Sequence, residues 1–137
     1  MSKEKIYIFD TTLRDGAQTQ GVDFSLDDKE KIAITLDNLG VDYIEGGWPG
    51  ANPTDTEFLN KNHDFKNAKM TAFGMTKKTE HSAENDPMIS SLINSKTSSI
   101  CIFGKTWDFH VDIALDITKE ELKALAEKTE QTEASTK

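Results

Sequence analysis

Residues 10–18 read DTTLRDGAQ and place two carboxylates and a guanidinium around a glycine, directly after the apolar run IYIF. Because neighbouring Arg and Asp side chains form a bidentate pair poorly, we expect Arg14 and Asp15 to face different partners. Asp15 suits a hard divalent cation, and Arg14 suits an anionic oxygen. These groups fit carbonyl or enolate chemistry, in which a cation polarises a keto oxygen and Arg14 offsets the negative charge that develops.

Other polar residues also follow the apolar runs that we expect to be strands. Glu45 ends the second run, and the segments 76–78 and 105–110 follow the third and fourth. In both barrels and open parallel sheets, the carboxyl ends of the strands meet on one face, so these residues should gather at one rim. Each position taken alone also fits a turn, because turns favour short polar side chains.

Short apolar runs alternate with amphipathic segments along the chain, which is the pattern of βα units. The expected strands are KIYIF, VDYIEGG, KMTAFG and SSICIFG. A near capping box at Ser25 and Asp28 begins a helix predicted over residues 26–39, and Gly40 supplies its C-terminal stop.

The later helices carry similar signals at their first residues. Asn52-Pro53 and Asp86-Pro87 each combine a capping side chain with a proline in the first turn. The last helix should begin at Thr118, where Glu121 closes a capping box. The apolar period stops after Ala126, so we expect a partial barrel over residues 1–126 and a polar C-terminal tail over residues 127–137.

These elements predict an α/β fold made of about four βα units. Four units are the first half of a (β/α)8 barrel, or TIM barrel, and are also enough for a small open sheet. The phosphate-binding fingerprint G-x-G-x-x-G is missing after the first strand, which favours the half barrel.

Composition narrows the classes of function that fit this chain. The 137 residues carry a formal net charge of −8, which disfavours binding to nucleic acid or to an anionic membrane. No apolar run approaches the roughly 20 residues of a membrane span, and the N-terminus lacks a signal-peptide core, so a cytoplasmic location is expected. Cys101 is the single cysteine and is expected to be a buried small hydrophobe.

The stretch FDTTLRDGAQ resembles the opening motif of a family of metal-dependent (β/α) barrel enzymes. That family includes 2-isopropylmalate, homocitrate and citramalate synthases and 3-hydroxy-3-methylglutaryl-CoA lyase. The later stretches DYIEGGWPGANPTD, TAFGMTKK and CIFGKTWDFHV resemble the citramalate synthase group of the family. The resemblance runs from about residue 6 to about residue 122 and implies the N-terminal portion of a synthase.

The resemblance also implies roles for residues of this chain. Asp15 would bind a catalytic divalent ion (Mn, Mg or Zn), and Arg14 would stabilise the enolate and alkoxide oxygens. Gln18 would line the keto-acid pocket, and Glu45 would lie on the substrate side. The implied reaction condenses acetyl-CoA with a 2-keto acid, pyruvate in the citramalate synthase group, to give (R)-citramalate for isoleucine biosynthesis.

The sequence departs from the family pattern, since it lacks the family's His-x-His pair, its general acid/base residues from later strands and its C-terminal regulatory domain. The family holds its metal partly through a His-x-His pair later in the barrel, whereas His63, His81 and His110 are isolated here. A half barrel also leaves strand edges open, so a homo-oligomer or pairing with a missing C-terminal half is expected. The alternatives are a non-catalytic half-barrel remnant or assembly module, an enzyme of the 2-isopropylmalate or homocitrate synthase type, and a lyase of the same family.

Overall fold

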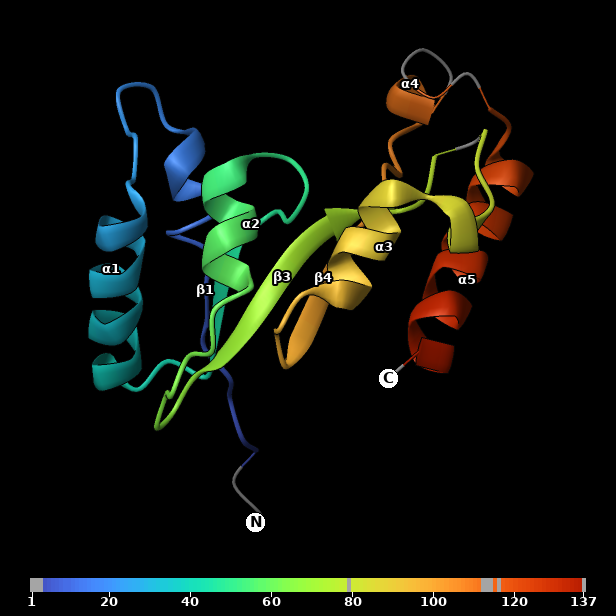
Figure 1. The fold of residues 1–137 in the computed structure, drawn as a ribbon. Helices are drawn as coiled ribbons and strands as arrows, with labels where there is room; N and C mark the ends of the chain where they lie inside the picture. Colours follow the sequence, from blue (N-terminus) through green and yellow to red (C-terminus); the bar gives the residue numbers. More distant parts are fainter. Residues whose placement is uncertain (1–3, 79, 112–114, 116, 137) are drawn as a thin grey trace.

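A parallel four-stranded sheet in the order β1-β2-β3-β4 organises the chain (Figure 1). The computed structural model describes residues 4–78, 80–111, 115 and 117–136. The elements are β1 (Phe9–Asp10), η1 (Gly16–Gln18), α1 (Leu26–Leu39), β2 (Tyr43–Gly47), α2 (Pro53–Leu59), β3 (Lys69–Met75), η2 (Ala83–Asn85), α3 (Pro87–Asn94), β4 (Ser99–Phe103), α4 (Asp108–His110) and α5 (Lys119–Thr136). The α/β class and the half-barrel order of strands are therefore confirmed.

The predicted helix starts are confirmed by their capping contacts. Asp28 N–H donates to Ser25 Oγ, and Ser25 N–H donates to Asp28 Oδ2, which completes the capping box of α1. Asn52 accepts the N–H of Asp55 at the start of α2. Because these bonds satisfy N–H groups that a helix terminus leaves without partners, the caps fix where each helix begins.

The first strand is shorter than the apolar run KIYIF suggested. Ladder pairing begins only at Phe9, which is opposite Tyr43. Before that point the Asp42 carboxylate accepts the N–H of Ile8 at 2.9 Å, so a side chain takes the bond that a neighbouring strand would make. Ile6 and Tyr7 are exposed beyond it.

The last helix does not end where its apolar period stops. α5 continues from Lys119 to Thr136, through residues that we expected to form a tail. Thr129 is buried within this extension, and its hydroxyl donates to the carbonyl of Leu125 while accepting the N–H of Lys77. This tertiary contact explains why the polar segment is helical, and a domain boundary at residue 126 stays a prediction.

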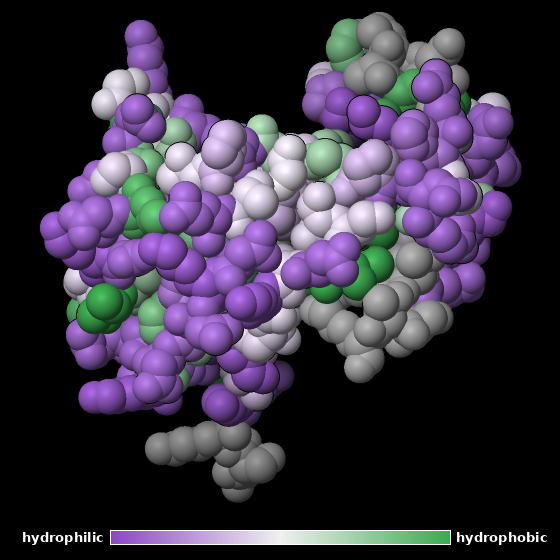
Figure 2. Space-filling view, in the orientation of Figure 1, coloured by the Kyte–Doolittle hydropathy of each residue, from purple (hydrophilic) through white to green (hydrophobic). Residues whose placement is uncertain are grey.

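The helices cover one face of the sheet, and this packing forms the core. α1 and α2 pack against each other and against β2, and α3 packs against β3, while α5 lies at the opposite end of the molecule from α1 (Figure 1). Hydrophilic residues cover most of α1 and α5 on the face shown in Figure 2. The core residues are Leu13, Ala33, Val41, Ile44, Phe58, Leu59, Met70, Ala72, Ile89 and Leu92.

Alternation along the strands decides which residues face away from the helices. A Cβ at Gly46 or Gly74 would collide with side chains of α2 or α3, so these positions face the helices. Their neighbours Glu45 and Phe73 therefore face the opposite side, which is the inside of a barrel. Of the described helices, none is long and apolar enough to cross a membrane.

Candidate functional site

The site centres on the guanidinium of Arg14, just beyond the carboxyl end of β1. Its Nε donates to Glu45 Oε2 at 2.6 Å, and its Nη1 donates to Asp15 Oδ1 at 3.0 Å. Its Cζ lies 4.1 Å from the centroid of the Phe73 ring, a cation–π distance. With only 18% of the Arg14 side chain exposed, the group is held in one place.

A compact turn delivers Arg14 to this position. The Thr11 carbonyl accepts the N–H groups of Arg14, Asp15 and Gly16 at 2.8–3.2 Å. The Asp10 carboxylate accepts both the N–H and the hydroxyl of Thr12. The side chains of Asp10 and Thr12 therefore help to build the turn, which explains why they precede Arg14.

Glu45 is the buried anion of the site, with 1% of its surface exposed. It lies on β2, where the pairing with β3 shifts register between Glu45 and Gly47. The Cys101 thiol on β4 lies close enough to interact with it. Burial raises the pKa of Cys101, the charge and hydrogen bond of Glu45 raise it further, and Arg14 opposes the shift.

Asp15 and Gln18 lie at the mouth of the site, on the turn that ends in η1. The Asp15 side chain is 62% exposed and contacts Arg14, so the expectation that the two neighbours face entirely different partners is wrong. A single hydrogen bond from Arg14 to Asp15 joins them, because adjacent side chains on one backbone cannot easily form a bidentate guanidinium–carboxylate pair. Gln18 is exposed on η1.

The described residues do not form a complete metal site. No group of three His, Cys, Asp or Glu side chains within them could hold an ion. A catalytic site usually has about three protein ligands, and Asp15 offers one carboxylate. The His63 ring stacks on Phe65, and His81 contacts the carbonyl of Asn85, so both have local partners.

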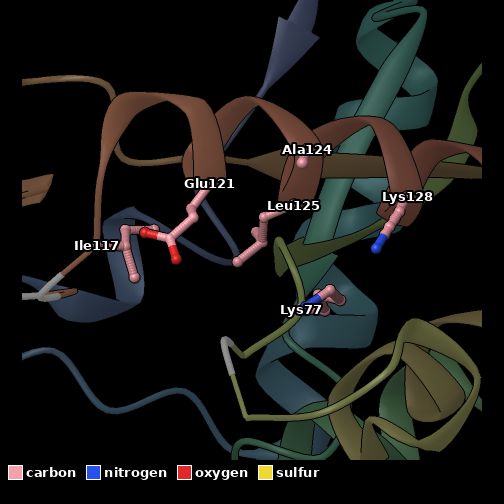
Figure 3. Close-up of a pocket in the computed structure, with 6 residues that line it drawn as sticks. All are labelled: Lys77, Ile117, Glu121, Ala124, Leu125 and Lys128. Carbon is pink, nitrogen blue, oxygen red and sulfur yellow. The ribbon is translucent and has the colours of Figure 1, made fainter.

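The predicted rim is present at the carboxyl ends of the strands. A pocket of about 410 Å³ is lined there by residues that follow β2, β3 and β4, including Trp48, Lys77, Lys78 and Lys105. A smaller pocket of about 200 Å³ adjoins it and is lined by Lys77, by Ile117 just before α5, and by residues of α5 (Figure 3). Lysines beside apolar walls can accommodate an anionic molecule that also carries an apolar part.

Sequence reasoning missed two charged residues beneath the site, Lys29 and Asp55. Lys29 Nζ donates to Asp55 Oδ1 at 2.5 Å, and both residues are buried. A signal was available, because Lys29 occupies the same helical face as Ala33 and Leu36, where an apolar residue is expected. A charged residue on a buried helical face indicates a buried partner.

The half barrel and its carboxyl-end rim are typical of parallel (β/α) barrel proteins. Comparison with known proteins identifies the family within this class. The family described as HMGL-like matches residues 5–135, and the chain belongs to this family. Its fold is similar to the crystal structure of an HMG-CoA lyase from Bacillus subtilis, with a TM-score of 0.69 and 17% identity. That match covers 95% of this chain and 43% of the lyase chain.

Curated relatives within the family carry the names of synthases. The chain is 55% identical over 120 residues to an (R)-citramalate synthase of Aquifex aeolicus, which covers 86% of this chain and 23% of that protein. It is 46% identical over 123 residues to an (R)-citramalate synthase of Sulfolobus acidocaldarius, covering 88% and 24%. A 2-isopropylmalate synthase 1 of Caldanaerobacter subterraneus is 38% identical over 123 residues, covering 89% and 30%. The chain thus spans about a quarter of the length of the citramalate synthases that it matches.

Proposed function

We propose that this chain is the N-terminal part of an acyltransferase that condenses acetyl-CoA with a 2-keto acid. The keto acid is pyruvate and the product is (R)-citramalate, an intermediate of isoleucine biosynthesis in the cytoplasm. The observation that carries the proposal is the match to (R)-citramalate synthases at 43–55% identity over 80–92% of this chain. The lower identity to 2-isopropylmalate synthases favours citramalate over the longer-chain products.

Arg14 is the catalytic residue of this proposal. Its guanidinium is already oriented by Glu45 and by the ring of Phe73, so it requires little reorganisation when an oxygen beside it becomes negative. Preorganised donors of this kind stabilise developing oxyanions by several kcal/mol. Gln18 and Glu45 are the substrate-side residues, with Gln18 at the open mouth and Glu45 setting the position of Arg14.

Asp15 is proposed as one ligand of a divalent ion, which would be Mn, Mg or Zn. When bound, such an ion polarises a keto oxygen. The described residues supply only one of about three ligands, so under this proposal the other ligands lie beyond the described residues.

The proposal is tested by mixing the chain with acetyl-CoA, pyruvate and Mn²⁺ or Mg²⁺ and measuring release of free CoA with a thiol reagent. A reaction without pyruvate corrects for the Cys101 thiol. We expect turnover when the remaining portion of an (R)-citramalate synthase is added in trans, and we expect Arg14→Gln to abolish it. If the complemented chain releases no CoA, or the Arg14→Gln variant is fully active, the proposal is wrong.

A second candidate is a non-catalytic half-barrel module, which the lack of a three-ligand cluster among the described residues favours. A ligand role for Asp15 predicts that Mn²⁺ raises the unfolding temperature and that Asp15→Ala removes the effect. For a non-catalytic module, Mn²⁺ should not raise the unfolding temperature of the complemented protein, and Asp15→Ala should not change the response to Mn²⁺.

A further inference from the structure

A buried ammonium group lies directly beneath the Arg14 site. Only 2% of Lys29 is exposed. Its Nζ donates to the carbonyl oxygens of Leu13 and Gly46, each at 2.8 Å, and to Asp55 Oδ1 at 2.5 Å. These three acceptors match the three N–H donors of an ammonium, so the buried charge is fully satisfied.

The partners of Lys29 are the immediate neighbours of the site residues. Leu13 precedes Arg14, and Gly46 follows Glu45. One ammonium therefore joins the two backbone segments that carry the Arg14–Glu45 ion pair. Its bonds to these two segments reach backbone oxygens, so it fixes where each segment runs.

Asp55 extends the same arrangement to a third segment. Its Oδ2 accepts the N–H of Trp48 at 2.9 Å. The Trp48 indole packs edge-on against Phe73, with ring centroids 5.5 Å apart. The Phe73 ring also makes the cation–π contact with the Arg14 guanidinium. The buried Lys29–Asp55 pair can therefore act on the Arg14 guanidinium by two routes. One route is the backbone next to Arg14 and Glu45, and the other is the Phe73 ring that contacts the guanidinium.

The chain also leaves room for this pair at Gly47. A Cβ at Gly47 would lie 2.5 Å from Asp55 Cγ and under 3 Å from both carboxylate oxygens. The backbone there has φ of +152°, which side-chain-bearing residues rarely adopt. Stability alone does not account for such a pair, because apolar replacements of buried ion pairs are often neutral or stabilising.

We propose that Lys29 and Asp55 are positioning residues, and that their buried ion pair holds the guanidinium of Arg14 against Glu45. The chemical use of this arrangement rests on the proposed function, whereas the positioning itself does not. The pair touches no substrate and acts only through Leu13, Gly46 and Trp48.

The test follows the Arg14 Nε–H directly by ¹⁵N-resolved NMR of the full chain, with the signal assigned by its loss in Arg14→Lys. A hydrogen-bonded Nε–H exchanges slowly with water, so we expect Lys29→Met to speed its exchange about tenfold. Asp55→Asn keeps an acceptor oxygen for Lys29 but removes the charge, and we expect a smaller increase.

Two controls separate positioning from general loss of stability. Lys31→Met makes the same change on an exposed lysine of α1 that pairs with Asp27. Leu92→Ala removes core packing behind β3 and lowers the unfolding temperature. Neither should change the exchange of the Arg14 Nε–H in the folded chain.

Unchanged exchange in folded Lys29→Met, or an equal effect of Leu92→Ala, overturns the proposal. If Lys29→Met does not fold, Asp55→Asn decides between the two outcomes. Faster exchange in these variants, combined with no CoA release in the complemented assay, would reject the proposed function and leave the positioning role standing.

Discussion

The contacts of Arg14 determine what its guanidinium can do. Nε and Nη1 are engaged by Glu45 and Asp15, while the Nη2 group has no protein acceptor among the described residues. A guanidinium fixed by two acceptors presents its remaining donors to a ligand in a fixed orientation. Under the proposed function, these remaining donors are available to a carboxylate or an enolate oxygen of the substrate.

The Cys101 thiol provides a reporter of charge in the site. Its pKa is raised by burial and by Glu45, so we expect Glu45→Gln to lower that pKa by removing the neighbouring negative charge. The pH dependence of alkylation measures the shift, and the single cysteine makes the signal specific. Glu57→Gln, an exposed change on α2, is the control. An unaltered or higher pKa in Glu45→Gln would contradict the assignment of Glu45 as the interacting charge.

At this scale the sequence predicted which residues gather but not how they are held. Asp15, Glu45 and Arg14 could be placed together because carboxyl ends of parallel strands share one rim. The direct contact between Arg14 and Asp15 depends on the turn around the Thr11 carbonyl, which no spacing rule specifies. Lys29 was missed because its role depends on two carbonyls that are distant in sequence.

Among the elements, the last residue of β2 leaves no room for a side chain. We expect Gly47→Ala to destabilise the chain by about 2–3 kcal/mol, because the added Cβ meets the Asp55 carboxylate at a strained φ. Thermal unfolding measures this cost. Gly16→Ala is the matched control, since its Cβ would meet Thr12 at ordinary contact distance. Equal losses in the two variants would contradict the close packing of Asp55 against β2.

Two buried carboxylates that cap loops make the fold sensitive to acid. Burial raises the pKa of Asp86, but N–H donors from Lys78, Met88 and Ile89 outweigh it and lower the pKa below the ordinary 3.8. Asp37 behaves likewise, with three N–H donors from residues 66–68 outweighing burial. A carboxylate whose pKa is lowered by folding stabilises the fold when the pH is above its ordinary, unfolded-state pKa. This stability is lost as the pH falls through the pKa of the folded state.

We therefore expect the unfolding temperature to fall as the pH decreases below about 4, the ordinary range of an aspartate. Asp86→Asn should be less stable at pH 7, by about 2 kcal/mol, and should lose less on acidification. Thermal melts between pH 7 and pH 3 measure both effects. Parallel pH profiles for wild type and Asp86→Asn would show that Asp86 does not contribute to acid sensitivity.

Caps and prolines predicted the helices well because they act within four residues of each other. Asn52-Pro53 and Asp86-Pro87 begin α2 and α3 as the sequence indicated. The predicted length of β1 was wrong, and the helical run of α5 past Ala126 was not predicted, because each depends on a distant partner, Asp42 for the strand and Lys77 for the helix. Local signals therefore predict where the helices begin better than they predict how far tertiary contacts extend a helix or shorten a strand.

For the whole molecule, the two edge strands are the decisive feature. β1 and β4 each pair on one side only within the described sheet. Exposed apolar side chains lie at Ile8, directly before β1, at Phe9 in β1 and at Phe103 at the end of β4. Unpaired edges with apolar side chains favour association with further strands. The HMG-CoA lyase with this fold has a chain more than twice as long, of which this one covers 43%.

We expect the isolated chain to self-associate through these edges at micromolar concentrations, which sedimentation velocity can measure. Ile8→Lys places a charge on the β1 edge and should shift the population toward monomer, because edge lysines oppose strand pairing. Ile34→Lys is a closely matched control, since Ile34 on α1 is 56% exposed and Ile8 is 57% exposed. Adding the remaining portion of an (R)-citramalate synthase should compete with self-association if both use the same edges. A wild-type chain that stays monomeric, or an equal effect of the two lysine variants, would show that the open edges do not drive assembly.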